Sequence, residues 1–179
     1  DGSVPPVDAG SEAAAPTCDP TADFGDVSEV PGLATAIAGI AGIDQTLDAT
    51  LTDDEELMLF VGCPAGTNTQ AGCAIYEAAL QNGTVVSVAA SANLNATTAF
   101  NRHPTLSADG KRMFMLRGPT GSIYISDRAN VVSPFPAPTP VASTNLGSGI
   151  VDTDPFFGRS GRLYFMRGTN AVRKLHYVN

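Results

Sequence analysis

The sequence lacks several features that would have pointed to a class of protein. It has no tryptophan, only two histidines and three cysteines among 179 residues. No apolar run approaches the roughly 18 residues that a membrane-spanning helix needs, so no such segment is expected. No Gly-x-Ser-x-Gly motif occurs, and two histidines offer little material for general acid–base catalysis. The composition therefore disfavours a membrane-spanning protein and carries no catalytic motif.

Basic residues are absent from the first 101 positions. That part holds 14 acidic residues and no Lys or Arg, whereas residues 102–179 hold 4 acidic and 10 basic residues, which together give the net charge of −8. An acidic protein is repelled by nucleic acid, so no nucleic-acid partner is expected. The acidic half could dock on a basic partner or on the basic half of another copy. The alternative is an acidic segment that is simply solvated.

A block of sequence occurs three times. Pro104–Gly118 and Pro155–Gly168 share a turn followed by an apolar strand, and Ala49–Gly62 is a weaker copy. The copies begin at 49, 104 and 155, so the period is 55 and then 51 residues. A period of this size, built of strands and tight turns, is typical of the blades of a β-propeller.

The predicted second strand of each copy is apolar at consecutive positions: Leu57–Val61, Met113–Leu116 and Leu163–Met166. Continuous rather than alternating apolar residues indicate a strand covered on both faces, as in stacked blades. We therefore expect an all-β fold of four-stranded antiparallel blades, about three of them, with the third one strand short. Three blades do not close a ring, so either further blades or other copies would complete it, and an open arc would expose apolar faces.

The chain divides into three predicted parts. Residues 1–22 have no aromatic residue and recurrent proline, which predicts a disordered tether. Residues 23–43 are expected to form a connecting edge strand and a loop, because their glycines disfavour the helix that the apolar spacing would allow. Residues 44–179 should hold the propeller repeats, with blades at about 44–100, 101–150 and 151–179.

Two of the cysteines, Cys63 and Cys73, bracket a loop between two predicted strands. Strand ends joined by a loop lie side by side, so a disulfide is expected, and with it an oxidising compartment. A metal site is the weaker interpretation, because no Cys-x-x-Cys or nearby His completes a ligand set. Cys18 is left over without an assigned role.

The second copy carries the clearest family signature. Pro104–Arg112, followed by Gly121–Arg128, resembles the WD40-like repeats of TolB-type β-propellers of the bacterial cell envelope. The third copy departs from the pattern at Gly158–Gly161, and the first copy lacks the glycine of the turn. The resemblance covers roughly residues 44–179 and implies the fold. It also implies an exported protein, periplasmic, anchored to the outer membrane or extracellular, but no single function.

Polar residues precede the repeated block. Alignment of the copies brings Asp48, His103 and Asp154 to one position, and these residues open the innermost strands, so they should ring one mouth of the central channel. Arg102 lies one position earlier, and Asn101 and Asp152 lie before it. These residues could bind a small polar ligand or a divalent cation, although no resident cofactor is expected. The alternative is that they bond backbone amides and fix the blade spacing.

Three hypotheses of function remain open. The first is a non-catalytic binding or scaffold module that recognises a protein or glycan partner. The second is a propeller hydrolase or lyase that uses Asp48, His103 and Asp154 around a cation. The third is a structural subunit that self-assembles through its open blade faces.

Overall fold

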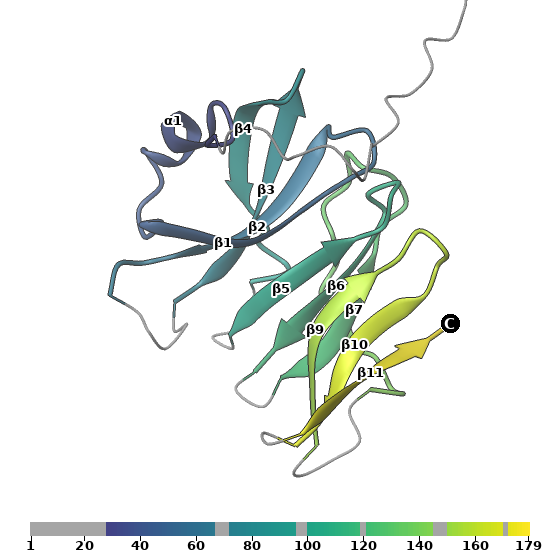
Figure 1. Ribbon diagram of the computed structural model, residues 1–179. Coiled ribbons are helices and arrows are strands. Elements are labelled where there is room, and N and C mark those ends of the chain that lie inside the picture. The colour runs from purple at the N-terminus through teal and green to yellow at the C-terminus, as the bar shows by residue number, and fades with distance from the viewer. Residues whose placement is uncertain (1–27, 67–71, 96–99, 119–120, 145–149, 170–171) are drawn as a thin grey trace, which may run out of the picture.

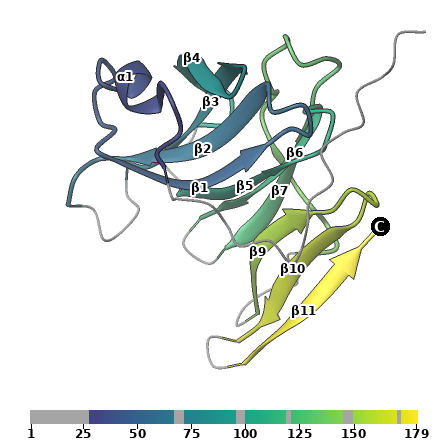
Figure 2. The same cartoon turned by 45° about the horizontal axis from the view of Figure 1, so that its top comes forward.

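The computed structural model describes residues 28–66, 72–95, 100–118, 121–144, 150–169 and 172–179. Three antiparallel sheets are stacked face to face along the chain, from the blue first sheet to the yellow third sheet (Figures 1 and 2). The predicted tether over 1–22 lies outside the described residues. Within the described ranges, no helix has the length and apolar character needed to cross a membrane.

The strands of each sheet follow one another in chain order. The first sheet contains β1 (Gln45–Leu51), β2 (Leu57–Cys63), β3 (Ala74–Gln81) and β4 (Thr84–Ala90). The second contains β5 (Asn101–Leu106), β6 (Arg112–Arg117), β7 (Ser122–Asp127) and β8 (Thr139–Pro140). The third contains β9 (Val151–Phe157), β10 (Leu163–Gly168) and β11 (Arg173–Val178). The prediction of an all-β chain made of propeller blades, with a three-stranded last blade, is confirmed.

Local turn chemistry sets the strand boundaries. The hairpin between β3 and β4 turns at Asn82 and Gly83, whose φ angles of 51° and 72° match the type I′ turn that these residues favour. β8 is only two residues long and lies at the edge of the second sheet. Its neighbourhood is rich in proline, which cannot donate to a ladder and is tolerated at an edge.

The core lies between the sheets. Each sheet has a back face, which is turned toward the preceding part of the chain, and a forward face, which is turned toward the following sheet. Leu59 and Val61 on the forward face of the first sheet pack in one buried cluster with Met113 and Met115 on the back face of the second. Phe114 and its neighbours on the forward face of the second sheet pack in another cluster with residues of the third. Both faces of β2 and β6 are therefore covered, as the continuous apolar pattern predicts.

The expectation of an edge strand and loop over 23–43 is wrong for the described residues 28–43. They contain no strand, and a five-residue helix, α1 (Leu33–Ile37), lies against the back face of the first sheet (Figure 1). The helix contains no glycine: Gly32 is its N-cap and Gly39 follows its end, so the glycines bound the helix and keep it short. Within it, Leu33 and Ile37 gain burial against the cluster that holds Met58 and Phe60.

The predicted disulfide is present between Cys63 and Cys73, whose Cα atoms lie 4.2 Å apart. It joins the end of β2 to the residue before β3 and closes a loop across a sequence separation of 10 residues. Both cysteines are buried in the cluster between the first and second sheets. The crosslink therefore stabilises the loop at the end of the first interface.

Candidate functional site

Three residues from three different sheets meet in the middle of the innermost strands β1, β5 and β9, and not at the strand starts as the sequence predicts, because each strand begins two or three residues earlier. The Nδ1 atom of His103 lies 3.5 Å from Oδ1 of Asp48 and 3.7 Å from Oδ1 of Asp154. The backbone N–H of His103 also donates to Oδ2 of Asp48 at 3.3 Å. An imidazole is thus held between two carboxylates, each contributed by a neighbouring sheet. Their role in ligand binding stays a prediction.

The backbone at these positions has the same unusual conformation three times. The φ angles of Asp48, His103 and Asp154 are 49°, 48° and 51°, in the left-handed region that non-glycine residues seldom occupy. Each residue lies where the pairing of the first strand with the second shifts register, as in a β-bulge. Such a conformation costs about 1–2 kcal/mol per residue, so the surrounding sheet must hold it. The bulges redirect these three side chains toward one another.

The cluster lines a shallow groove of about 280 Å³, which we name the mouth groove. Its walls come from the middle parts of β1, β5 and β9. The lining residues are Asp48, Ala49, Thr50, His103, Pro104, Thr105, Asp154, Pro155 and Phe156. The side chain of Asp154 is 52% exposed and Phe156 is 63% exposed, whereas Asp48 and His103 are about one-third exposed or less. A ligand could therefore reach a carboxylate and an aromatic ring from solvent.

The groove is rich in hydrogen-bond acceptors. An ionised carboxylate only accepts hydrogen bonds, so Asp48 and Asp154 suit a partner group that carries N–H or O–H donors. Among the described residues, no three or more His, Cys, Asp or Glu side chains are placed to hold a metal ion. The geometry of the cluster is that of an imidazole flanked by two carboxylates.

Asn101, which the sequence also predicts as a candidate ligand-binding residue, forms a hydrogen bond within the second sheet. It lies opposite Arg117 in the pairing of β5 with β6, and its Oδ1 accepts from Nε of Arg117 at 3.0 Å. Nη2 of Arg117 donates to the carbonyl of Leu94 at 2.6 Å, in the segment that leads into the second sheet. Burial lowers the pKa of Arg117. Arg102 follows Asn101 on β5 and is half-buried; neither residue lines the mouth groove.

Asp152 repeats this arrangement in the third sheet. It is 2% exposed and accepts from Nε and Nη2 of Arg167 at 2.7 and 2.9 Å. Nη2 also donates to the carbonyls of Ser143 and Thr144, each at 3.0 Å. The hydrogen bond with Asp152 raises the pKa of Arg167. Asp152 and Asn101 thus anchor the chain entering each sheet, and the structure brings neither into the His103 cluster.

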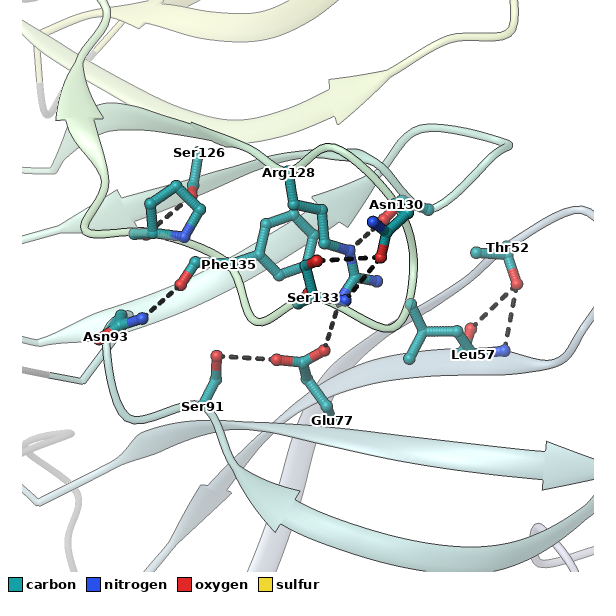
Figure 3. A network of polar contacts seen from close by, with 12 residues as sticks. Thr52, Leu57, Glu77, Ser91, Asn93, Ser126, Arg128, Asn130, Ser133 and Phe135 are labelled. Atoms are coloured by element: carbon teal, nitrogen blue, oxygen red, sulfur yellow. Dashed lines mark hydrogen bonds and ion pairs between the residues drawn. The ribbon is translucent and has the colours of Figure 1, made fainter.

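Sequence reasoning missed a polar network between the first and second sheets (Figure 3). The side chain of Arg128 is 2% exposed, and its Nη1 lies 3.0 Å from Oε2 of Glu77. Its Nε donates to the carbonyl of Gly110 at 2.8 Å, and its guanidinium carbon lies 4.0 Å from the ring centroid of Phe135. Ser91 donates to the other carboxylate oxygen of Glu77 at 2.9 Å. Within the described ranges this network has no counterpart between the second and third sheets, so the repeat pattern gave no signal for it.

No protein-family model and no curated protein matches the chain. Among solved structures, it is similar to a puromycin-hydrolysing peptidase of Mycobacterium tuberculosis, with a TM-score of 0.54 and 12% identity over 78% of this chain and 21% of that one. It is also similar to TolB from Acinetobacter baumannii, with a TM-score of 0.38 and 14% identity over 76% of this chain and 41% of that one. The chain therefore spans less than half the length of either structure. The likeness to the peptidase concerns the fold alone, and together with the three stacked sheets it supports a β-propeller-like fold without assigning a family.

Proposed function

We propose that the chain is a binding module of an exported β-propeller and that it recognises a protein or glycan partner through the mouth groove. The observation that carries the proposal is the convergence of Asp48, His103 and Asp154, one from each sheet, at the lip of a solvent-open groove. The buried disulfide supports an oxidising location, because such bonds persist mainly outside the cytosol.

The chemistry of the groove favours particular partner groups. Asp48 and Asp154 would accept from an ammonium, a guanidinium or sugar hydroxyls, and charge-assisted bonds of this kind are stronger than neutral ones. Phe156 offers an exposed ring against which an apolar face can pack. A partner that brings a donor and a flat apolar surface together would satisfy both features.

The backbone argues for a preorganised site. Three left-handed residues hold the groove in one shape, so little conformational entropy is lost when a partner binds. Strained conformations of this kind concentrate at functional positions, where the surrounding structure compensates for their cost. Two carboxylates already flank the imidazole of His103, and this arrangement suits the binding of a partner better than acid–base chemistry.

The test is a titration of the ¹⁵N-labelled chain with three defined probes: an Arg- and Lys-containing peptide, an acidic peptide of the same length and a neutral β-linked oligosaccharide. We expect the basic peptide or the oligosaccharide to shift the amide signals of Asp48, His103 and Asp154, and the acidic peptide to leave them unchanged.

The matched variants separate the groove from general surface charge. Asp48→Asn with Asp154→Asn should abolish the shifts, whereas Asp127→Asn, at an exposed carboxylate paired with Arg112, should preserve them. The proposal fails if none of the probes moves the groove signals, or if the double variant binds as well as the original chain.

A further inference from the structure

The stack of sheets has two ends, and the residues that the structure describes cover only one of them. The back face of the first sheet lies under α1 and the residues that follow it, a segment that we call the cap (residues 31–43). The forward face of the third sheet has no covering element among the described residues. Figures 1 and 2 place α1 and β11 at opposite ends of the molecule.

The repeat shows what these two faces are built to contact. The N–H groups of Thr52, Ser107 and Gly158 close equivalent turns onto the carbonyls of Leu57, Arg112 and Arg162, which aligns the second strands of the three sheets. The back-face positions of these strands are all at most 1% exposed. They are Met58 and Phe60, then Met113 and Met115, then Leu163 and Phe165. In the second and third sheets the preceding sheet covers them, and in the first sheet the cap takes that place.

The forward-face positions behave differently at the end of the stack. Ile75, Ile123 and Leu175 pair with equivalent residues of the second strands, and they are 0%, 0% and 68% exposed. Leu175 thus stands in solvent where its two counterparts pack against the next sheet. Tyr164 lies directly between Phe156 and Tyr177 in the pairing of the third sheet, so three aromatic side chains form a row. We call this exposed surface, with Met166, the open face.

The cap is held weakly. α1 has five residues, no side-chain N-cap and no fully buried residue. A helix of this length has little stability of its own and depends on its contacts with the sheet. The N–H of Val85 donates to the carbonyl of Pro31 at the start of the cap, and the N–H of Asp44, directly after the cap, donates to the carbonyl of Cys63, each at 2.8 Å. Local release of such a segment costs far less than unfolding of the sheet.

The two ends of the stack also carry opposite charge. Residues 28–95 contain eight acidic and no basic residues, whereas 150–179 contain five basic and two acidic ones. Arg162 lies at the edge of the open face, with its guanidinium carbon 5.0 Å from the ring centroid of Tyr177. An acidic sheet of matching apolar pattern is therefore the complementary partner, and the first sheet of the chain itself has both properties.

We propose that the cap is displaceable and that the back face which it releases docks on the open face of a second copy. The contact is head-to-tail, so it uses two different surfaces and can propagate into rings or open chains. In this contact a back face meets a forward face, as it does between the first and second sheets and between the second and third sheets. The cap thereby blocks self-association by occupying the acceptor face.

One feature limits the strength of this contact. In each internal interface a threonine hydroxyl accepts a backbone N–H from the next sheet, from Leu106 to Thr50 at 3.4 Å and from Phe157 to Thr105 at 3.1 Å. Phe156 stands at the corresponding position of the third sheet, and it has no hydroxyl. The docking between copies therefore lacks this bond, and we expect it to be reversible and concentration-dependent.

The test measures mass by light scattering and sedimentation over a range of concentrations. Leu33→Ala with Ile37→Ala shortens the two largest apolar side chains by which α1 packs on the first sheet, keeps helix propensity and leaves the sheets unaltered. We expect this variant to form oligomers at concentrations at which the original chain is monomeric. The exposed substitution Ala34→Asp, on the same helix, should leave the chain monomeric.

A second pair of variants identifies the surface that receives the freed face. Leu175→Lys with Tyr177→Lys, added to the cap variant, should restore the monomer. Val132→Lys with Val172→Lys adds the same two charges at residues outside β11 that are 90% and 64% exposed, and it should not. Oligomers should also dissociate as salt rises, because screening weakens the contact between oppositely charged ends. The proposal is overturned if the folded cap variant stays monomeric, if the original chain assembles equally well, or if the oligomers survive the open-face substitutions.

Discussion

The two interfaces between the sheets are built from the same repeated positions, yet they differ in what else they contain. The interface between the first and second sheets includes the disulfide and the network around Arg128 and Glu77 in addition to its apolar cluster. The interface between the second and third sheets depends on a smaller cluster around Phe114 and Phe165. The repeat therefore supplies the apolar contact, and residues outside the repeat decide how strongly each pair of sheets is joined.

Shortening a buried side chain between the second and third sheets should have the largest effect on the free energy of unfolding. Phe165→Ala removes a fully buried ring and should reduce the free energy of unfolding by about 3–5 kcal/mol. Because the described part of the chain covers only one face of the third sheet, the loss should fall mainly on that sheet. Hydrogen exchange should then show fast exchange in β9–β11 and retained protection in β2 and β6. Equal loss of protection in all three sheets would show that the two interfaces do not differ in strength.

Breaking the polar network should weaken the first interface by a smaller amount. Arg128→Met keeps the apolar stem but removes the ion pair with Glu77 and the bond to Gly110, and we expect a loss of about 2 kcal/mol in denaturant unfolding. Arg112→Met is the control, because its pair with Asp127 is half exposed and should contribute less than about 1 kcal/mol. Equal losses from the two substitutions would contradict the special role of Arg128.

The sequence predicted the features that the repeat encodes. The strands, the turn at Asn82 and Gly83, and the disulfide follow from local pattern and short loops. It failed for α1, because the glycines lie at the boundaries of the helix and not within it, and because Leu33 and Ile37 pack on the first sheet. It also missed the pair of Glu77 and Arg128, which lie 51 positions apart at sites that the repeat does not relate.

For the mouth groove, too, the sequence predicts what the repeat encodes and misses what depends on the pairing of the strands. Alignment of the copies predicts that these residues share one position on the innermost strands, but it wrongly places that position at the strand starts, and it gives no backbone conformation and no distance. The register shifts that turn Asp48, His103 and Asp154 toward one another depend on how each first strand pairs with its second. Asn101 and Asp152 lie only two positions earlier, and pairing across the strand commits them to Arg117 and Arg167 instead.

The left-handed positions of the mouth groove allow a matched comparison of side chains. Asp154→Ala should destabilise the fold relative to Asp154→Gly by about 1 kcal/mol, because only glycine adopts a φ of 51° without steric cost. Both variants lose the carboxylate, so the difference between them in thermal or denaturant unfolding reports the backbone alone. Equal stability of the two variants would argue against the observed conformation.

The smallest expected effect is a loss of stability at acidic pH that comes from the second sheet and has no counterpart at the equivalent turn of the third sheet. The hydroxyl of Ser107 donates to Asp109 at 2.7 Å and, with the N–H of Lys111, lowers the pKa of that carboxyl. A carboxyl whose pKa is lower in the folded state stabilises the fold above its unfolded pKa, and this contribution is lost as pH falls through the folded value. Gly158 stands at the position of Ser107 in the third sheet and has no hydroxyl.

Ser107→Ala should therefore raise the pKa of Asp109 toward its ordinary value. The free energy of unfolding at neutral pH should also be slightly lower than in the original chain. Below about pH 4, the free energy of unfolding should change less with pH than it does in the original chain. A carboxyl carbon titration by NMR, combined with unfolding at pH about 7 and about 3, measures both changes. An unchanged titration of Asp109 would show that the serine does not stabilise its charged form.

The stacking of three sheets is tested most directly by nuclear Overhauser contacts between methyl groups in the folded chain. The account predicts contacts from the methyl groups of Met113 and Met115 to those of Leu59, Val61 or Ile75, and from the methyl groups of Leu163 to those of Leu116 or Ile123. It predicts none between Leu59 and Leu163, which the second sheet separates. Contacts between Leu59 and Leu163, or none across the sheet faces, would contradict it.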